Sequence, residues 1–132
     1  MSVTEAATER AAIKQVVQLY IDGVSKGDGE KLRHAFHESA WMYGSLAWTR
    51  YDEPISELIA LVTGQPLDSD GSYEARIASV VQVEDAATAV VEEDGCWGGI
   101  SFTSFFALAK IDGRWQIVNK TFAHTAGELP TA

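Results

Sequence analysis

The sequence has 132 residues, the size of one ordinary domain and too few for two domains with separate cores. Apolar residues make up 46% of the chain, which excludes an intrinsically disordered protein. Ten Lys and Arg against nineteen Asp and Glu give a net charge of −9, and this charge disfavours binding to nucleic acids or anionic membranes because their phosphates are repelled.

The N-terminus shows neither the basic start nor the apolar run of a signal peptide. No apolar stretch approaches the roughly 18 residues of a membrane span. The single cysteine, Cys96, cannot form an internal disulfide, so we expect a cytoplasmic protein. The three His residues lack the ligand spacing of a structural zinc site, and we expect no metal and no organic cofactor. The predicted organisation is one domain over 1–132, with frayed ends at 1–10 and 125–132.

Three helices are predicted in the first half of the chain. Ser2 and Glu5 form a capping box, and an apolar stripe at helical spacing continues that helix to Lys26 and Gly27. Asp28 caps a short second helix that ends near Phe36. A short aromatic strand follows at 40–44. The third helix is predicted to begin at Asp52 or Glu53, with Pro54 in its first turn, and to end at 64–66.

From residue 72 onward the apolar pattern has a period of two, which is typical of strands. Strands are predicted at 73–83, 87–93, 100–111 and 114–124. Asp112 and Gly113 predict a two-residue type I′ hairpin turn between the last two strands. Helices followed by a meander of antiparallel strands indicate the α+β class, with the helices on one face of the sheet.

The predicted turn fixes the pairing of the last two strands, because a two-residue loop places Ile111 opposite Arg114. Continuing this register places Phe106 opposite Asn119 and Ser104 opposite Thr121 on the face under the helices. The other face is half apolar, and such a face is rarely left to water. We therefore expect a homodimer through this outer face, formed by Phe105, Ala107, Val118, Lys120 and Phe122.

Four segments together resemble a known family. They read YIDGV at 20–24, KGD at 26–28, AFH at 35–37 and KIDGRWQIVNKTF at 110–122. In this order they resemble the lumazine-binding branch of the NTF2-like superfamily and its SnoaL-like relatives. The resemblance covers about 11–122. It implies a cone-shaped fold, in which a strongly curved sheet wraps a long helix and leaves a pocket at its open end, and a dimer packed through the outer sheet face.

The resemblance leaves the activity open. The superfamily includes ketosteroid isomerase, scytalone dehydratase, limonene epoxide hydrolase and polyketide cyclases, beside noncatalytic transport and association domains. Relatives usually carry an Asp where this chain has Ser104. Ketosteroid isomerase uses a carboxylate on its first strand, and the corresponding segment 41–44 has none. The steroid-isomerising chemistry is therefore not supported.

A pocket of this kind would have apolar walls with a few polar groups, which suits a flat aromatic or polycyclic ligand. The predicted lining residues are Tyr20, Phe36, Trp41, Trp48, Leu58, Phe102, Ser104, Phe106 and Asn119. The alternative is that these aromatic side chains simply fill the core. The candidates for acid–base catalysis are His37, which could titrate near neutral pH, Tyr43, which could polarise a carbonyl, and Asp52, which could equally cap a helix.

Three further positions have a structural interpretation that we favour. Cys96 has acidic neighbours, which favours a partly buried thiol over a nucleophile. Lys120 falls on the face assigned to the dimer, which favours an interfacial ion pair over a nucleophile. Glu92, Glu93 and Asp94 could hold a hard cation, but their spacing favours a solvated strand end.

Two functions follow from this reading. The first is a cofactor-independent isomerase, dehydratase or cyclase that acts on a carbonyl-containing organic substrate. The second is a noncatalytic ligand-binding or association domain. A buried titratable group that opens into the pocket would favour the enzyme.

Overall fold

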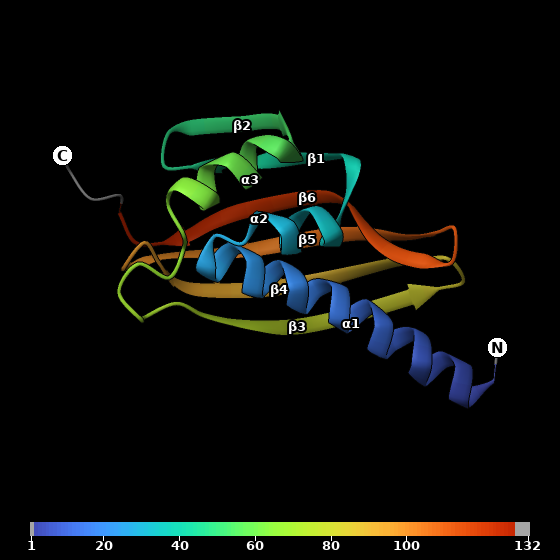
Figure 1. The fold of residues 1–132 in the computed structure, drawn as a ribbon. Helices are drawn as coiled ribbons and strands as arrows, with labels where there is room; N and C mark the ends of the chain where they lie inside the picture. The colour runs from blue at the N-terminus through green and yellow to red at the C-terminus, as the bar shows by residue number, and fades with distance from the viewer. Residues whose placement is uncertain (1, 129–132) are drawn as a thin grey trace.

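The computed structural model describes residues 2–128, and it contains three helices and six strands in that range (Figure 1). Residues 1 and 129–132 of the predicted frayed ends lie outside the described residues. The elements follow one another as α1 (Val3–Lys26), α2 (Gly29–Ala35), β1 (Phe36–Leu46), β2 (Thr49–Pro54), α3 (Ile55–Gly64), β3 (Glu74–Val83), β4 (Ala86–Cys96), β5 (Ile100–Ile111) and β6 (Arg114–Ala126).

The strands form one sheet in the order β2-β1-β6-β5-β4-β3. All neighbouring strands are antiparallel except β1 and β6, which are parallel. The three helices lie on one face of the sheet, and α1 crosses that face along its length (Figure 1). This arrangement confirms the predicted α+β class, with the helices on one face of the sheet. Within residues 2–128, no helix is long and apolar enough to cross a membrane.

The helix ends follow the predicted capping. Ser2 Oγ accepts a hydrogen bond from the amide of Glu5 at 3.1 Å, and Gly27 ends α1 with a φ of 72°. Asp28 accepts hydrogen bonds from the amides of Glu30 and Lys31 at the start of α2. These contacts satisfy amide groups that have no partner within the helix.

Two boundaries differ from the prediction. The first strand is longer than 40–44, because β1 begins at Phe36 directly after α2. The third helix begins later, at Ile55, because residues 49–54 pair with β1 as strand β2. Asp52 therefore lies in an edge strand, where it faces Tyr43 across the β1–β2 pair, and Pro54 is the residue before the helix.

The hairpin between β5 and β6 has the predicted turn but not the predicted register along its whole length. Asp112 and Gly113 have φ values of 52° and 81°, as a type I′ turn requires. Leu108 pairs with Ile117 as expected, but Ala107 pairs with Asn119, so Val118 is an extra residue in a β-bulge.

The bulge exchanges the two faces of the second half of β6. Phe106 lies opposite Lys120 and Ser104 lies opposite Phe122. Lys120 and Phe122 therefore turn toward the helices, whereas Asn119 turns toward the outer face. The prediction that Lys120 and Phe122 belong to the outer face is wrong, because one inserted residue reverses the side chains of every residue beyond it.

The core lies between α1 and the inner face of the sheet. Tyr20 of α1 packs against Phe106 of β5 with ring centroids 4.7 Å apart and against Phe36 of β1 at 6.0 Å. All three side chains are almost completely buried. Such edge-to-face contacts stabilise the core beyond the burial of apolar area. They also fix the ring of Tyr20, whose hydroxyl reaches the site described next.

Candidate functional site

A small cavity lies between α1, α3 and the inner face of the sheet, at the end of the sheet where β4 meets β5. Its volume is about 40 Å³. The walls are mainly apolar and aromatic, and the polar groups are one carboxylate, one amine and two phenols. The lining residues are Tyr20, Met42, Leu46, Tyr51, Leu58, Leu61, Leu67, Glu93, Trp97, Phe102, Lys120 and Phe122.

Glu93 is the buried carboxylate of the cavity, with 2% of its surface exposed. It lies near the end of β4, on the inner face. The hydroxyl of Tyr20 donates to Oε1 at 3.1 Å, Ser104 Oγ donates to the same oxygen at 3.0 Å, and the hydroxyl of Tyr73 donates to Oε2 at 2.8 Å. Three hydroxyl donors offset the cost of placing a carboxylate in this apolar surrounding.

Lys120 is the buried amine of the same cavity, with 5% of its surface exposed. Its Nζ lies 4.2 Å from the ring centroid of Phe122 and 5.9 Å from that of Tyr20, so the ammonium faces two aromatic rings. Among residues 2–128 no carboxylate forms an ion pair with Nζ, and no sealed side-chain nitrogen or oxygen lacks a hydrogen-bond partner, so the amine keeps some accessible surface. Burial lowers the pKa of Lys120 to about 8, although the nearby Glu93 carboxylate opposes the shift.

Three titratable groups close to Glu93 are held protonated, namely Tyr20, Tyr73 and Cys96. Burial and the charge of Glu93 raise the pKa of both Tyr20 and Tyr73 above the ordinary value. The thiol of Cys96 is also buried, and its pKa is raised to about 12, mainly by burial and then by Glu93. This agrees with the structural interpretation of Cys96, because a protonated thiol is a poor nucleophile.

A second, wider pocket lies outside the cavity and shares four of its walls. Leu46, Tyr51, Leu61 and Trp97 line both spaces. The outer pocket has a volume of about 760 Å³ and is completed by Gln65, Pro66, Asp68 and Ser69 from the segment after α3. A ligand could therefore place a small group in the inner cavity while its larger body lies in the outer pocket.

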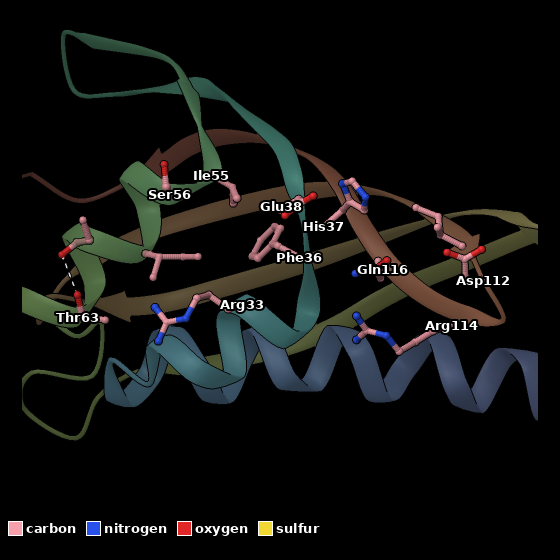
Figure 2. Close-up of a pocket in the computed structure, with 13 residues that line it drawn as sticks. Arg33, Phe36, His37, Glu38, Ile55, Ser56, Thr63, Asp112, Arg114 and Gln116 are labelled. Carbon is pink, nitrogen blue, oxygen red and sulfur yellow. Dashed lines mark hydrogen bonds between the residues drawn. The ribbon is translucent and has the colours of Figure 1, made fainter.

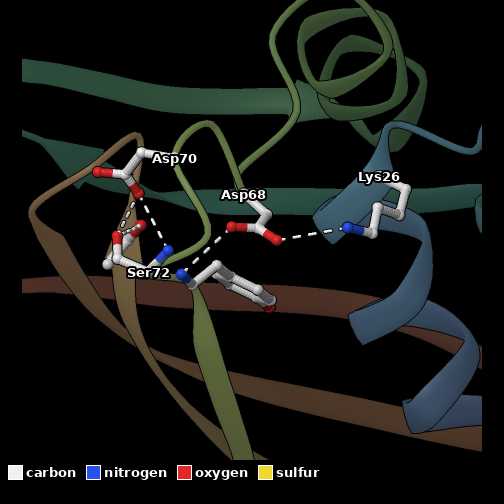
Figure 3. A network of polar contacts seen from close by, with 6 residues as sticks. Lys26, Asp68, Asp70 and Ser72 are labelled. Carbon is white, nitrogen blue, oxygen red and sulfur yellow. Dashed lines mark hydrogen bonds and ion pairs between the residues drawn. The ribbon is translucent and has the colours of Figure 1, made fainter.

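The segment after α3 is tied to both α1 and the start of β3 (Figure 3). Asp68 forms an ion pair with Lys26 at 3.4 Å and accepts a hydrogen bond from the amide of Tyr73. Asp70 accepts hydrogen bonds from both the amide and the hydroxyl of Ser72. These contacts position the backbone of Tyr73, whose hydroxyl binds Glu93.

Six of the nine predicted pocket residues lie at this site. Tyr20, Leu58 and Phe102 line the cavity, and Ser104 binds Glu93. Phe36 and Phe106 lie behind Tyr20 as packing partners. The other three lie elsewhere. Trp41 is 38% exposed, and Trp48 is fully exposed in the turn before β2. Asn119 lies on the outer face because of the bulge at Val118.

The three predicted acid–base residues lie outside the cavity, and only Tyr43 and Asp52 are neighbours, across the β1–β2 pair. His37 lies on β1 and lines an open surface hollow of about 800 Å³ between α2, α3, β1 and β6, together with Arg33 and Arg114 (Figure 2). Its Nδ1 contacts Ser39 Oγ at 2.7 Å. Tyr43 is 40% exposed, and Asp52 accepts a hydrogen bond from Trp41 Nε1 at 2.6 Å.

The sequence analysis missed Glu93 and Lys120 as site residues. Glu93 was placed at a solvated strand end, but Ala87, Ala89, Val91 and Glu93 alternate along β4 and are all buried. This period of two was a usable signal for the inner face. Lys120 was placed on the wrong face by the unrecognised bulge, and no sequence signal marks that bulge. Among residues 2–128, no three His, Cys, Asp or Glu side chains converge to hold a metal ion.

Residues 8–123 match the family described as "Putative lumazine-binding". The chain belongs to this family. The match covers almost every residue that builds the cavity, from α1 to Phe122 of β6. Membership confirms the NTF2-like resemblance drawn from the sequence. It does not by itself identify the ligand of this chain.

This chain is similar to two solved structures and to one named protein. A solved NTF2-like protein of unknown function from Shewanella baltica OS155 is 28% identical, with a TM-score of 0.82 and coverage of 96% of this chain and 99% of the other. A second, from Methylobacillus flagellatus KT, is 30% identical, with a TM-score of 0.81 and coverage of 96% of both chains. The protein named "Aldolase FrzH" from Cladobotryum sp is 24% identical over 116 residues, covering 88% of this chain and 91% of the relative.

Proposed function

We propose that this protein binds a small carbonyl-containing organic molecule and moves a proton next to that carbonyl without a cofactor. The observation that carries the proposal is Lys120, a nearly buried amine in the cavity wall that faces the rings of Phe122 and Tyr20 and forms no ion pair with a described residue. An amine in a largely apolar wall gains from a hydrogen-bond acceptor, and an oxygen atom of a ligand in the cavity would supply one.

The geometry assigns different parts of the ligand to the two spaces. The carbonyl oxygen would accept a hydrogen bond from Lys120 Nζ in the inner cavity. The apolar body would lie between Leu46, Tyr51 and Trp97 in the outer pocket. Glu93 lies in the wall of the same cavity and is the candidate proton acceptor, with Tyr20 and Tyr73 stabilising its charged form. Enolisation, dehydration, cyclisation and aldol chemistry all begin with this proton transfer. The name of the 24% identical relative, an aldolase, falls within this class.

A noncatalytic ligand-binding role is the second candidate. Glu93 already accepts hydrogen bonds from three hydroxyl groups of the chain, so both of its oxygens are engaged, and the inner cavity is small. Both features suit a protein that holds a ligand and does not transform it.

The two candidates are separated by hydrogen exchange with 2-tetralone, a flat ketone with acidic hydrogens next to its carbonyl. The protein and the ketone are incubated in D₂O, and the loss of those hydrogens is followed by NMR. The enzyme hypothesis expects exchange well above the rate without protein, and a loss of most of that rate in Glu93→Gln. Binding of 2-tetralone without faster exchange would support the noncatalytic role; it is measured by the change in tryptophan fluorescence, and the change should be lost in Trp97→Phe. Absence of binding would contradict both.

A homodimer through the outer face of the sheet is also proposed, with a corrected set of residues. Phe105 and Ala107 lie on that face and Val118 lies at the bulge. Lys120 and Phe122 are not part of the proposed interface, because they lie on the inner face. Trp41 and Tyr43 of β1 join it, because they are exposed and lie beside Asn119 and Thr121 across the β1–β6 pair. The cytoplasmic location stays a prediction.

A further inference from the structure

The amine of Lys120 differs from every other lysine in its surroundings. Lys14 and Lys31 lie on exposed helix surfaces, and Lys26 and Lys110 form ion pairs with Asp68 and Glu9. Lys120 alone is buried, and it lines the inner cavity, whereas the pocket that Lys110 lines is an open surface hollow in which its amine is paired with Glu9. A lysine used only for packing could be replaced by an apolar residue without leaving a charge in the core. A small molecule bound in the cavity can therefore contact the amine of Lys120 away from bulk water, which is not the case for the other lysines.

Burial raises the fraction of the Lys120 amine that is in the neutral, nucleophilic form. With its pKa lowered to about 8, roughly a tenth of the amine is neutral at pH 7, about two hundredfold more than for an ordinary lysine. The groups that face it are the carboxylate of Glu93, the phenol of Tyr20, the thiol of Cys96 and the ring of Phe122. Glu93 is the one carboxylate among these groups. Neither Glu93 nor any other carboxylate within residues 2–128 is close enough to Lys120 to form an ion pair with its amine.

The neighbouring groups can also handle the protons of a condensation reaction. Glu93 accepts hydrogen bonds from Tyr20 and Tyr73, so protons and a charged acceptor lie along one wall of the cavity. The thiol of Cys96 is held protonated and does not compete as a nucleophile. The cavity of about 40 Å³ has room for up to about three water molecules by the usual measure, and therefore for a carbonyl group and the water it would lose.

From this arrangement we infer that Lys120 forms a Schiff base with an aldehyde or ketone bound in the cavity. The neutral Nζ attacks the carbonyl carbon, so that an N–C bond forms and the C–O π bond breaks. A proton of the amine then moves through the Glu93–Tyr20 pair to the carbonyl oxygen, which becomes a hydroxyl. The resulting carbinolamine takes up one proton from solvent, equal to the one that Lys120 released on becoming neutral, and loses its hydroxyl as water, which leaves a C=N⁺ bond to Lys120. No oxidant, reductant or cofactor is needed, and hydrolysis reverses the step.

The inference rests on the proposed carbonyl ligand and deepens it. An iminium at Lys120 withdraws electrons from the adjacent carbon more strongly than a hydrogen-bonded carbonyl does. It would therefore assist the loss of a proton to Glu93 or the making and breaking of a carbon–carbon bond at that position. The ligand class narrows to unhindered aldehydes and ketones, because esters and amides do not form stable imines with an amine.

The test is reductive trapping with 2-naphthaldehyde, which has no hydrogens next to its carbonyl and so isolates imine formation from proton transfer. The protein is incubated with the aldehyde and sodium cyanoborohydride and measured by intact mass and peptide mapping. We expect one adduct per chain, located on Lys120, with a rate that rises from pH 6 and levels off above pH 8. Lys120→Met should lose this adduct, whereas Lys14→Met, which removes an exposed lysine of α1, should keep it.

The outcomes separate this inference from the proposed function. Mapping of the natural protein locates the modified lysine even if Lys120→Met does not fold. Adducts spread over surface lysines, or none at Lys120, would overturn the Schiff base. If 2-tetralone still binds and exchanges its hydrogens in that case, the proposed function stands with Lys120 as a hydrogen-bond donor only. If trapping succeeds and exchange does not occur, the Schiff base stands and the proton-transfer function is rejected.

Discussion

The hydroxyl of Tyr73 donates a hydrogen bond of 2.8 Å to Glu93 Oε2. Tyr73 directly precedes β3, so this contact joins the start of β3 to the buried end of β4. Tyr20 binds the same carboxylate from α1. We expect Tyr73→Phe and Tyr20→Phe each to lower the free energy of unfolding by about 1–3 kcal/mol, because each leaves a buried carboxylate with one donor fewer. Urea unfolding at pH 7 measures this change.

Tyr43→Phe is the matched control for the two tyrosine variants. Its side chain is 40% exposed on the outer face, so the loss of its hydroxyl should change the free energy of unfolding by less than about 0.5 kcal/mol. Equal effects at Tyr43 and Tyr73 would show that the hydroxyl donors do not stabilise the buried carboxylate.

The buried amine predicts a specific dependence of stability on pH. The pKa of Lys120 is about 8 in the folded protein and near 10.4 in the unfolded chain, so between these values the unfolded chain binds more protons. Stability from this group therefore rises as the pH increases from 8 to 10 and is lowest below pH 8. Lys120→Met lacks the group, so its advantage over the natural protein should be about 3 kcal/mol at pH 7 and should shrink toward pH 10.

The comparison of the two proteins by urea unfolding at pH 7, 8, 9 and 9.5 checks this prediction. The raised pKa values of Tyr20 and Tyr73 act above pH 10 and are shared by both proteins, so they cancel in the difference. A difference that stays constant over this range would mean that the amine is not desolvated in the folded state.

The fold could be predicted from the sequence because its signals are local. Ser2, Gly27, Asp28 and the Asp112-Gly113 turn each act within a few residues, and the structure confirms all of them. The start of α3 was misplaced because Asp52 and Pro54 are compatible with both a helix start and an edge strand. Only the pairing with β1, a contact between segments, decides which one forms.

The site was less predictable because it depends on contacts that are distant in the sequence. Tyr20 and Glu93 are brought together by the packing of α1 on β4, and no local pattern encodes that contact. Lys120 depends on a single extra residue in β6, which has no marker such as a glycine in the sequence. The alternation of β4 did place Glu93 on the inner face, but three adjacent acidic residues hid that signal.

The exposed aromatic residues of the outer face predict self-association. Phe105 is 51% exposed at the middle of the sheet, with Trp41 and Tyr43 on the neighbouring part of the same face. A stable interface buries about 800 Å² on each partner, and this face has the apolar centre that such an interface needs. We expect sedimentation at micromolar concentration to show a dimer and Phe105→Asp to shift it to monomer, because a charge would be buried.

Val3→Asp is the control for the dimer variant. It adds the same charge at an exposed position, 88% accessible, at the start of α1 and away from the outer face. The dimer should persist in this variant. A monomeric natural protein, or dissociation by both substitutions, would contradict an interface centred on Phe105.

Gly95 is the point at which the end of β4 contacts the segment before β3, and its carbonyl accepts a hydrogen bond from Ser72 Oγ. It has a φ of 70°, and a Cβ there would lie 2.2 Å from the carbonyl oxygen of Ser72, so backbone would have to move. Gly71 has a similar φ of 87°, but a Cβ there meets nothing within 4 Å. Gly71→Ala should therefore show only the conformational strain, about 1 kcal/mol, whereas Gly95→Ala should lose clearly more.

The same substitution should also reach the cavity, because Gly95 lies between Glu93 and Cys96. Displacing Ser72 moves Tyr73, whose hydroxyl holds Glu93, so Gly95→Ala should weaken the binding of 2-tetralone severalfold while Gly71→Ala leaves it unchanged. Urea unfolding and the ligand titration by fluorescence measure both effects on the same samples. Equal stability of the two alanine variants would show that the backbone contact between Gly95 and Ser72 is not tight, and unchanged binding in Gly95→Ala would show that Tyr73 is positioned independently of it.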